Sequence, residues 1–292
     1  MEDDFNEGAM FSAGAVSGNP LAKYFRTPGL TITLPSKAAF MPKGSVEMTM
    51  TDELVVFPMR AADELLLKSP DALMSGFAVQ ELIRSCIPGI KAPQLVSMPD
   101  LDVILLAIRA ASYGEKMEVA VTCPSCGHEN TFDAHLPSML GTIKELPSHC
   151  SVRLSDEISV QIRPYNLRNA TQVGTATFQE TRKLQFAEDQ SDEVKSEMMN
   201  QSLKRMTELN AQMMADCVMQ VLTPEGAISN PAFIAEFFAN VPNKWTKKVE
   251  TALADLNQKG MDKNLNVTCS KCQHEWTTEL EFDPSNFFAQ GS

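Results

Sequence analysis

The chain has 292 residues, of which 43% are hydrophobic and 21% charged, a balance that predicts a folded core rather than a disordered chain. Its 25 basic and 37 acidic residues give a formal net charge of −12. This charge argues against a general nucleic-acid binder and against docking on an anionic lipid surface, because both need an excess of cations. At roughly 150 residues per domain, the length indicates one large or two ordinary domains.

The sequence carries no signal for membrane insertion or secretion. The most apolar run, residues 101–111, is short and contains Asp102 and Arg109, so it is not expected to span a bilayer. The acidic N-terminus lacks the basic and then apolar pattern of a secretion signal. Seven cysteines, an odd number, fit free thiols and metal ligation better than a disulfide scaffold. We therefore expect the protein to be made and kept in a reducing cytoplasm.

The first 115 residues are predicted to form an arm followed by a mixed domain. Residues 1–28 are rich in acids and small residues and predict a flexible N-terminal arm, which is either disordered or ordered against a neighbouring subunit. Residues 29–115 are predicted to form a mixed strand and helix domain. The expected elements are strands at 30–34, 46–50 and 54–57, a helix from about 70 to 86, and an apolar helix over 101–113 that Ser97 and Asp100 open with capping-box spacing.

The remaining residues are predicted to alternate between strands and helices. Residues 116–136 are interpreted as a first zinc-ribbon hairpin, and 137–165 as a strand region. Residues 166–260 are interpreted as a helical insertion, and 261–292 as a second zinc-ribbon hairpin with a C-terminal tail. The expected elements are strands at 116–122, 131–136, 150–154 and 158–163, helices at 167–187 and from 191 to about 222, two shorter helices around Phe233 and Trp245, and strands on both sides of residues 269–272.

One short pattern occurs twice, far apart in the chain. Residues 121–129 read VTCPSCGHE and residues 267–275 read VTCSKCQHE, and both lie between alternating strand patterns. Each copy therefore predicts a hairpin whose tip carries two thiols. Structural zinc is bound tetrahedrally by four such ligands. We predict one structural zinc per chain, with the ligands Cys123, Cys126, Cys269 and Cys272.

The two thiol pairs are separated by 269 − 126 − 1 = 142 residues. Closing such a loop costs roughly 4 kcal/mol, whereas structural zinc contributes about 10–16 kcal/mol, so a shared site is energetically feasible. The fold class is accordingly predicted as α+β, with a helical domain, small antiparallel strands and a zinc-ribbon-like element split by a long helical insertion.

Other residues in the two copies raise secondary expectations. His128 and His274 follow the thiols, but four thiolates already complete the site, so we expect these histidines to donate hydrogen bonds near the sulfurs. Gly127 suits a left-handed turn position. Gln273 stands in the equivalent place and predicts a less regular second turn.

The sequence offers no recognisable catalytic or cofactor-binding residues. Residues 116–135 and 263–283 each have a net charge of −2, which disfavours a nucleic-acid reader, and a four-thiolate zinc leaves no open position for catalysis. His149 beside Cys150 raises the alternative of a thiol nucleophile, but sequence neighbours rarely form such a pair. Cys86 and Cys217 are expected to be core thiols.

Two apolar features admit both a core and an interface interpretation. Met199, Met206 and Met213 recur every seven residues and form either a stripe that faces the core or an adaptable face for another subunit. Phe287 and Phe288 either anchor on a partner or pack back onto the ribbon.

A family resemblance covers residues 45–136 most clearly. The helix LDVILLAIR at 101–109, followed by ASYGE at 111–115 and a strand into TCPSCG at 122–127, resembles the baseplate hub proteins of contractile-tailed, T-even-type bacteriophages. The second copy of the repeat supports the resemblance, and the metal positions that it carries over are the same four cysteines.

The resemblance implies a non-enzymatic structural protein of the virion, in the tail baseplate hub. Its implied partners are other baseplate and tail proteins, in several copies in a symmetric assembly, without nucleic acid or membrane insertion. The implied location is the tail baseplate, and the host cytoplasm during assembly. The alternatives are a transient assembly chaperone for the hub or tail and a zinc-ribbon factor associated with nucleic acid.

Overall fold

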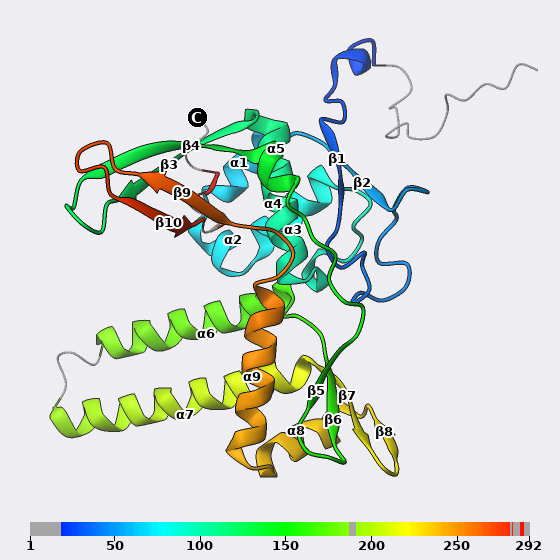
Figure 1. Cartoon of the computed structure of the whole chain (residues 1–292), viewed down its shortest axis with the longest axis vertical. Helices are drawn as coiled ribbons and strands as arrows, with labels where there is room; N and C mark the ends of the chain where they lie inside the picture. Colours follow the sequence, from blue (N-terminus) through cyan, green and yellow to red (C-terminus); the bar gives the residue numbers. More distant parts are fainter. Residues whose placement is uncertain (1–18, 187–190, 281, 283–286, 289–292) are drawn as a thin grey trace, which may run out of the picture.

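The computed structural model describes residues 19–186, 191–280, 282 and 287–288 (Figure 1). It combines helices with small antiparallel sheets, so the expectation of an α+β fold is confirmed. Two separate hydrophobic clusters form the interior of the described residues. No helix in these residues is both long enough and apolar enough to cross a membrane.

The first cluster is built around one central helix. Its elements are η1 (Ala22–Tyr24), β1 (Leu30–Thr33), β2 (Glu53–Val56), α1 (Ala61–Leu67), α2 (Pro70–Met74), α3 (Phe77–Cys86), η2 (Pro93–Leu95) and α4 (Met98–Tyr113). Strands β1 and β2 pair antiparallel, and α4 packs between them and the other helices (Figure 1). Val103, Ile104 and Ile108 of α4 are completely buried, which accounts for the apolar character of this stretch.

The start of α4 confirms that Ser97 caps the helix, but Asp100 accepts from the Ser97 hydroxyl and not from its backbone N–H, as a capping box would require. The Ser97 hydroxyl accepts a hydrogen bond from the Asp100 backbone N–H (3.3 Å), and the Asp100 carboxylate accepts one from the Ser97 hydroxyl (2.6 Å). The same carboxylate also accepts from the backbone N–H of Ser36 (2.9 Å), so it ties α4 to the loop after β1. Burial raises the pKa of Asp100, although the hydrogen bonds from the two serines lower it.

Two expectations for this part of the chain are wrong. The single helix expected over residues 70–86 is divided into α2 and α3, because Gly76 adopts a left-handed conformation with φ of 68°. A Cβ atom at Gly76 would collide with Oγ1 of Thr171, so the break also lets a later helix pack closely. Residues 46–50 form no strand; only an isolated bridge joins Val46 to Ile90.

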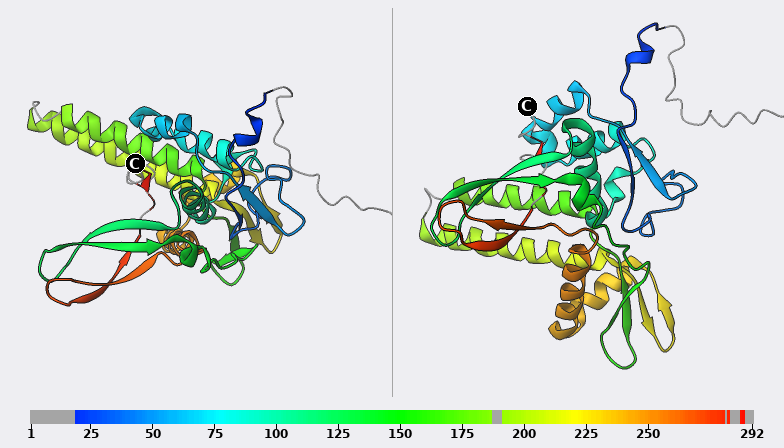
Figure 2. Two further views of the ribbon diagram at one scale, coloured as in Figure 1. Left: turned by 90° about the horizontal axis from the view of Figure 1, so that it is seen from above. Right: turned by 45° about the horizontal axis from the view of Figure 1, so that its top comes forward.

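The second cluster is a sheet covered by helices. Strands β5 (Cys150–Arg153), β6 (Ser159–Ile162), β7 (Val218–Thr223) and β8 (Gly226–Ile228) pair antiparallel in the order β5-β6-β7-β8. Helices α8 (Pro231–Asn240) and α9 (Asn243–Asn257) contribute buried side chains to the same core. Helices α6 (Leu167–Phe186) and α7 (Asp192–Asp216) run beside each other as a long hairpin (Figures 1 and 2).

The helix expected to reach residue 222 ends at Asp216, and strand β7 follows it. The buried residues of β7 include Val218 and Val221, which are three positions apart and so imitate helical spacing. A register shift in the pairing of β6 with β7 accounts for this departure from strict alternation. Residues 166–260 therefore supply two strands as well as helices.

The methionine stripe on α7 has different surroundings along its length. Met214 is buried in the second core, Met206 and Met213 are half-buried, and Met199 is exposed. The buried Glu180 of α6 accepts a hydrogen bond from Ser202 (2.6 Å) and pairs with Arg205 (3.4 Å), which joins the two helices. The three methionines of the stripe lie outside both hydrophobic clusters, and only the neighbouring Met214 belongs to the second core.

Two further hairpins project beside the first core. They are β3 (Lys116–Thr122) with β4 (Glu129–His135), and β9 (Asn264–Thr268) with β10 (Glu275–Glu279); helix α5 (Leu136–Leu140) follows β4. The hairpins lie side by side in both views although they come from distant parts of the chain (Figures 1 and 2).

Near the described end of the chain, Phe287 and Phe288 are buried in the first core, where the Phe287 carbonyl accepts a hydrogen bond from Arg109 of α4. They pack back onto the chain, but against this core rather than only onto the ribbon.

Candidate metal centre

The second hairpin is anchored to the body of the protein at its base. Lys263, just before β9, forms ion pairs with Asp102 of α4 (3.2 Å) and with Glu279 of β10 (3.4 Å). The carbonyl of Gly260 accepts a hydrogen bond from the Lys144 backbone N–H (2.7 Å). Gly260 has a φ of 114°, and a Cβ atom there would lie 3.1 Å from Pro99 Cβ, so the chain passes too close for a larger residue.

Aromatic side chains join the hairpins between base and tip. Phe132 of β4 meets Trp276 of β10 edge to face, with ring centroids 6.2 Å apart. His274 stacks on Trp276 with centroids 6.0 Å apart. The ring of His274 therefore packs against the indole of its own hairpin. The contact of Phe132 with Trp276 fixes how the two hairpins lie against each other.

The two tips adopt the same hydrogen-bonded turn. In the first tip, the Cys123 N–H donates to the His128 carbonyl (2.9 Å) and the Gly127 N–H donates to the Cys123 carbonyl (3.0 Å). In the second tip, the corresponding bonds join Cys269 to His274 (2.9 Å) and Gln273 to Cys269 (3.0 Å).

The expectation of a less regular second turn is therefore wrong. Gln273 takes the same left-handed conformation as Gly127, with φ of 60° against 68°. The turn geometry is retained, and Gln273 bears the conformational cost of a side chain in the left-handed region.

The four predicted cysteines meet at the paired tips. Their sulfur atoms all lie within 4.8 Å of one another. The Cys123 and Cys272 sulfurs are 3.7 Å apart, as are those of Cys126 and Cys269, so each close pair joins the two hairpins. A disulfide would bring two sulfurs to about 2.05 Å, so these are separate thiols. Among the described residues, no other group of metal-binding side chains gathers in this way.

Asn130 of β4 bridges the two tips and was not predicted from the sequence. Its side-chain carbonyl accepts hydrogen bonds from the backbone N–H and the hydroxyl of Ser270, both at 2.9 Å. Its amide nitrogen donates to the His128 carbonyl (2.9 Å) and lies 3.7 Å from the Cys269 sulfur. The side chain is only 6% exposed and is a positioning residue for the thiols. An asparagine four residues after a CxxC motif is too common to have identified it.

The packing of the thiols separates their proton affinities. Burial raises the pKa of Cys269, but the backbone N–H groups of Cys272 and Lys271 outweigh it and lower the pKa to about 6. For Cys126, the His128 N–H lowers the pKa, whereas the neighbouring sulfurs outweigh it and raise the pKa to about 12. Cys269 therefore ionises more readily than a free thiol, whereas Cys126 resists ionisation.

The remaining cysteines lie away from this cluster. Cys86 and Cys217 are fully buried core thiols, as expected, and burial raises their pKa to about 11 and about 12. Cys150 is half-buried on β5 against the second core. His135 caps α5, where its Nδ1 accepts a hydrogen bond from the Ser138 N–H (3.3 Å).

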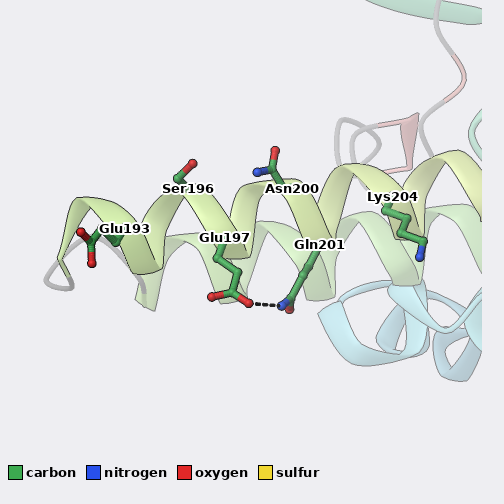
Figure 3. Close-up of a pocket in the computed structure, with 6 residues that line it drawn as sticks. All are labelled: Glu193, Ser196, Glu197, Asn200, Gln201 and Lys204. Carbon is green, nitrogen blue, oxygen red and sulfur yellow. Dashed lines mark hydrogen bonds between the residues drawn. The ribbon is translucent and has the colours of Figure 1, made fainter.

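A shallow surface pocket on α7 is lined by polar side chains (Figure 3). Its lining consists of Glu193, Ser196, Glu197, Asn200, Gln201 and Lys204. All six residues come from one helix, and Gln201 donates a hydrogen bond to Glu197 (3.3 Å) within it. Because these residues share one helix side, they do not enclose a substrate.

Comparison with protein families identifies a phage baseplate family. The family described as T4 bacteriophage base plate protein matches residues 46–289. No curated protein and no solved structure gives a significant match. The family match covers more than half of the chain, includes both cysteine pairs and confirms the expected T4-type baseplate resemblance. The chain belongs to this family of phage baseplate proteins.

Proposed function

We propose that this baseplate protein is a non-enzymatic structural component of the tail baseplate hub, and that one structural zinc fastens its two hairpins together. The observation that carries the proposal is the convergence of Cys123, Cys126, Cys269 and Cys272 from hairpins 142 residues apart. The family supports a location in the virion tail and partners among other tail and baseplate proteins. Assembly in the host cytoplasm would suit thiols that must stay reduced.

The sulfur geometry supports zinc as the ion. With Zn–S bonds of about 2.3 Å, a regular tetrahedron has edges of about 3.8 Å. The Cys123–Cys272 and Cys126–Cys269 sulfur separations, 3.7 Å each, match this edge. Four thiolates complete a tetrahedral zinc, and a closed site of this kind supports structure rather than hydrolysis.

The ion would act as a cross-link between distant parts of the chain. The first hairpin continues from α4 of the first core, whereas the second follows α9 of the second core. Bringing the tips together therefore restrains both cores as well as the hairpins. Metal binding that occurs only in the folded state adds directly to folding stability.

A structural role fits the surfaces better than the alternatives do. The hairpin segments 116–135 and 263–283 each carry a net charge of −2, and four thiolates on zinc add about −2 more, which disfavours nucleic acid. Retention on DNA at low salt, lost at high salt, would favour the nucleic-acid alternative.

The composition of purified virions tests the proposal against a transient assembly chaperone. Quantitative mass spectrometry, normalised to the tail sheath protein, should find a fixed integral copy number of this chain per tail. Its absence from intact virions, with accumulation on incomplete baseplates, would contradict a hub component and favour a chaperone.

A further inference from the structure

An apolar segment projects from the body near the described start of the chain. Leu21, Tyr24 and Phe25 are 60%, 74% and 55% exposed, so three large apolar side chains within five residues face solvent around η1. The root of the segment is fixed, because the Arg26 guanidinium donates hydrogen bonds to the carbonyls of Pro58 (2.7 Å) and Ser85 (2.6 Å). We call Leu21, Tyr24 and Phe25 the apolar arm.

A matching apolar groove lies at the edge of the four-stranded sheet. It has a volume of about 490 Å³ and runs between β7, β8 and α8. Its apolar lining comprises Val221, Ile228, Phe233, Ile234 and Phe237. Phe233 is 60% exposed, and β8 is an edge strand of its sheet. We call this the α8 groove.

The apolar arm and the α8 groove lie at opposite ends of the molecule. Figure 1 places η1 at the top and β8 with α8 at the bottom of the longest axis. An arm fixed at Arg26 therefore does not reach the groove of its own chain. We propose that the apolar arm of one copy occupies the α8 groove of a second copy, which gives a head-to-tail contact between identical chains.

Basic side chains lie close to the α8 groove, whose own lining includes one acid, Glu236. Asn240 lines the groove and Asn243 begins α9, so at most about 11 Å of chain separates them. Three lysines follow in the first turns of α9; Lys248 is held by the carbonyls of Arg153 (3.2 Å) and Leu154 (2.9 Å). Lys244 and Lys247 make no ion pair with other described residues. They are a local concentration of cations on a chain with net charge −12.

The chain that precedes the apolar arm carries the opposite charge. Four of residues 2–7 are acidic, namely Glu2, Asp3, Asp4 and Glu7. The 14 residues from Glu7 to Leu21 span up to about 46–50 Å when extended, so acids from the same copy can reach the lysines beside the occupied groove. This attraction selects a second copy of this chain as the occupant and steers the encounter.

The contact deepens the proposed assembly role and rests on it for its biological setting, but it is tested on purified full-length protein. Sedimentation velocity at increasing concentration should show self-association of the unmodified chain. An arm variant, Tyr24→Ser with Phe25→Ser, and a groove variant, Phe233→Ser, should each be monomeric. Phe178→Ser removes another exposed aromatic side chain, 45% exposed on α6, and should leave association unchanged.

Mixing the arm variant with the groove variant, which are each expected to be monomeric, gives the sharpest result. The arm variant retains its groove and the groove variant retains its arm, so a 1:1 mixture should form dimers and nothing larger. Lys244→Glu with Lys247→Glu should weaken association at least tenfold in low salt and less in high salt.

Persistent monomers in the mixture, or an unmodified chain that stays monomeric at about 100 μM, would overturn the proposal. So would a groove filled only by a different baseplate protein. Virion composition is measured separately, so a failed hub assignment and a failed head-to-tail contact give different results.

Discussion

Replacing Asn130 with alanine should loosen both hairpin tips at once. The change removes three hydrogen bonds of 2.9 Å, one to the His128 carbonyl and two from Ser270, together with the longer contact to the Cys269 sulfur. At about 1 kcal/mol net for each bond, and with Ser270 free to bond to water, we expect a loss of about 2–3 kcal/mol in unfolding free energy. Loss of such a supporting partner typically lowers metal affinity 10–100-fold.

Both quantities are measurable on the same variant. Competition with a chromophoric chelator gives the zinc affinity, and urea unfolding of the zinc-loaded protein gives the stability. Asn266→Ala is the matched control, because Asn266 is exposed on β9 and accepts only one bond, from the Thr277 hydroxyl (2.8 Å). The control should lose less than about 1 kcal/mol and bind zinc normally. Normal zinc affinity in Asn130→Ala, or an equal loss in both variants, would refute this role for Asn130.

Three other predictions follow from single side chains. Gln273→Gly should raise the unfolding free energy by about 1 kcal/mol, because it relieves a left-handed non-glycine residue, whereas Gly127→Gln should lower it by a similar amount; opposite signs in thermal or urea unfolding would contradict this. Burial raises the pKa of Asp100, so its contribution to stability is complete below the unfolded-state pKa near 3.9 and is lost as pH rises through the higher folded-state value. Asp100→Asn should abolish this loss, and parallel stability profiles of the two proteins above pH 4 would count against it. Cys150→Ala should retain assembly function, whereas Cys269→Ser should lose zinc and stability. Loss of function in a folded Cys150→Ala variant would instead favour a thiol-dependent enzyme.

Local patterns predicted the hairpins and the start of α4 well. The spacing of each CxxC pair belongs to its own turn, and Ser97 caps α4 through the Asp100 backbone N–H within one helical turn. Such features depend on neighbours in sequence, so the sequence reveals them directly. The repeat predicted a hairpin at each copy, but the less regular second turn expected from Gln273 was wrong, because both tips make matching hydrogen bonds.

Features set by distant packing were missed. The break at Gly76 exists where Thr171 of α6 approaches, and Asn130 gains its importance only because the second hairpin brings Ser270 beside it. In β7, a register shift against β6 replaced alternation with a helix-like spacing at Val218 and Val221. These failures share one cause, which is that tertiary contacts override the local period.

Residues 1–18 lie outside the described residues, so their predicted flexibility remains a prediction. The described part of the predicted arm, from residue 19 to 28, includes the short η1 turn and the fixed contacts of Arg26.

Zinc content is the most direct test of the account. Elemental analysis and native mass spectrometry of full-length protein, purified under reducing conditions, should give one zinc per chain. Removal of the metal by a strong chelator should then lower hydrogen-exchange protection in residues 116–136 and 263–283 together. A zinc-to-chain ratio near zero or two, or loosening of one hairpin alone, would contradict a single ion shared by both hairpin tips.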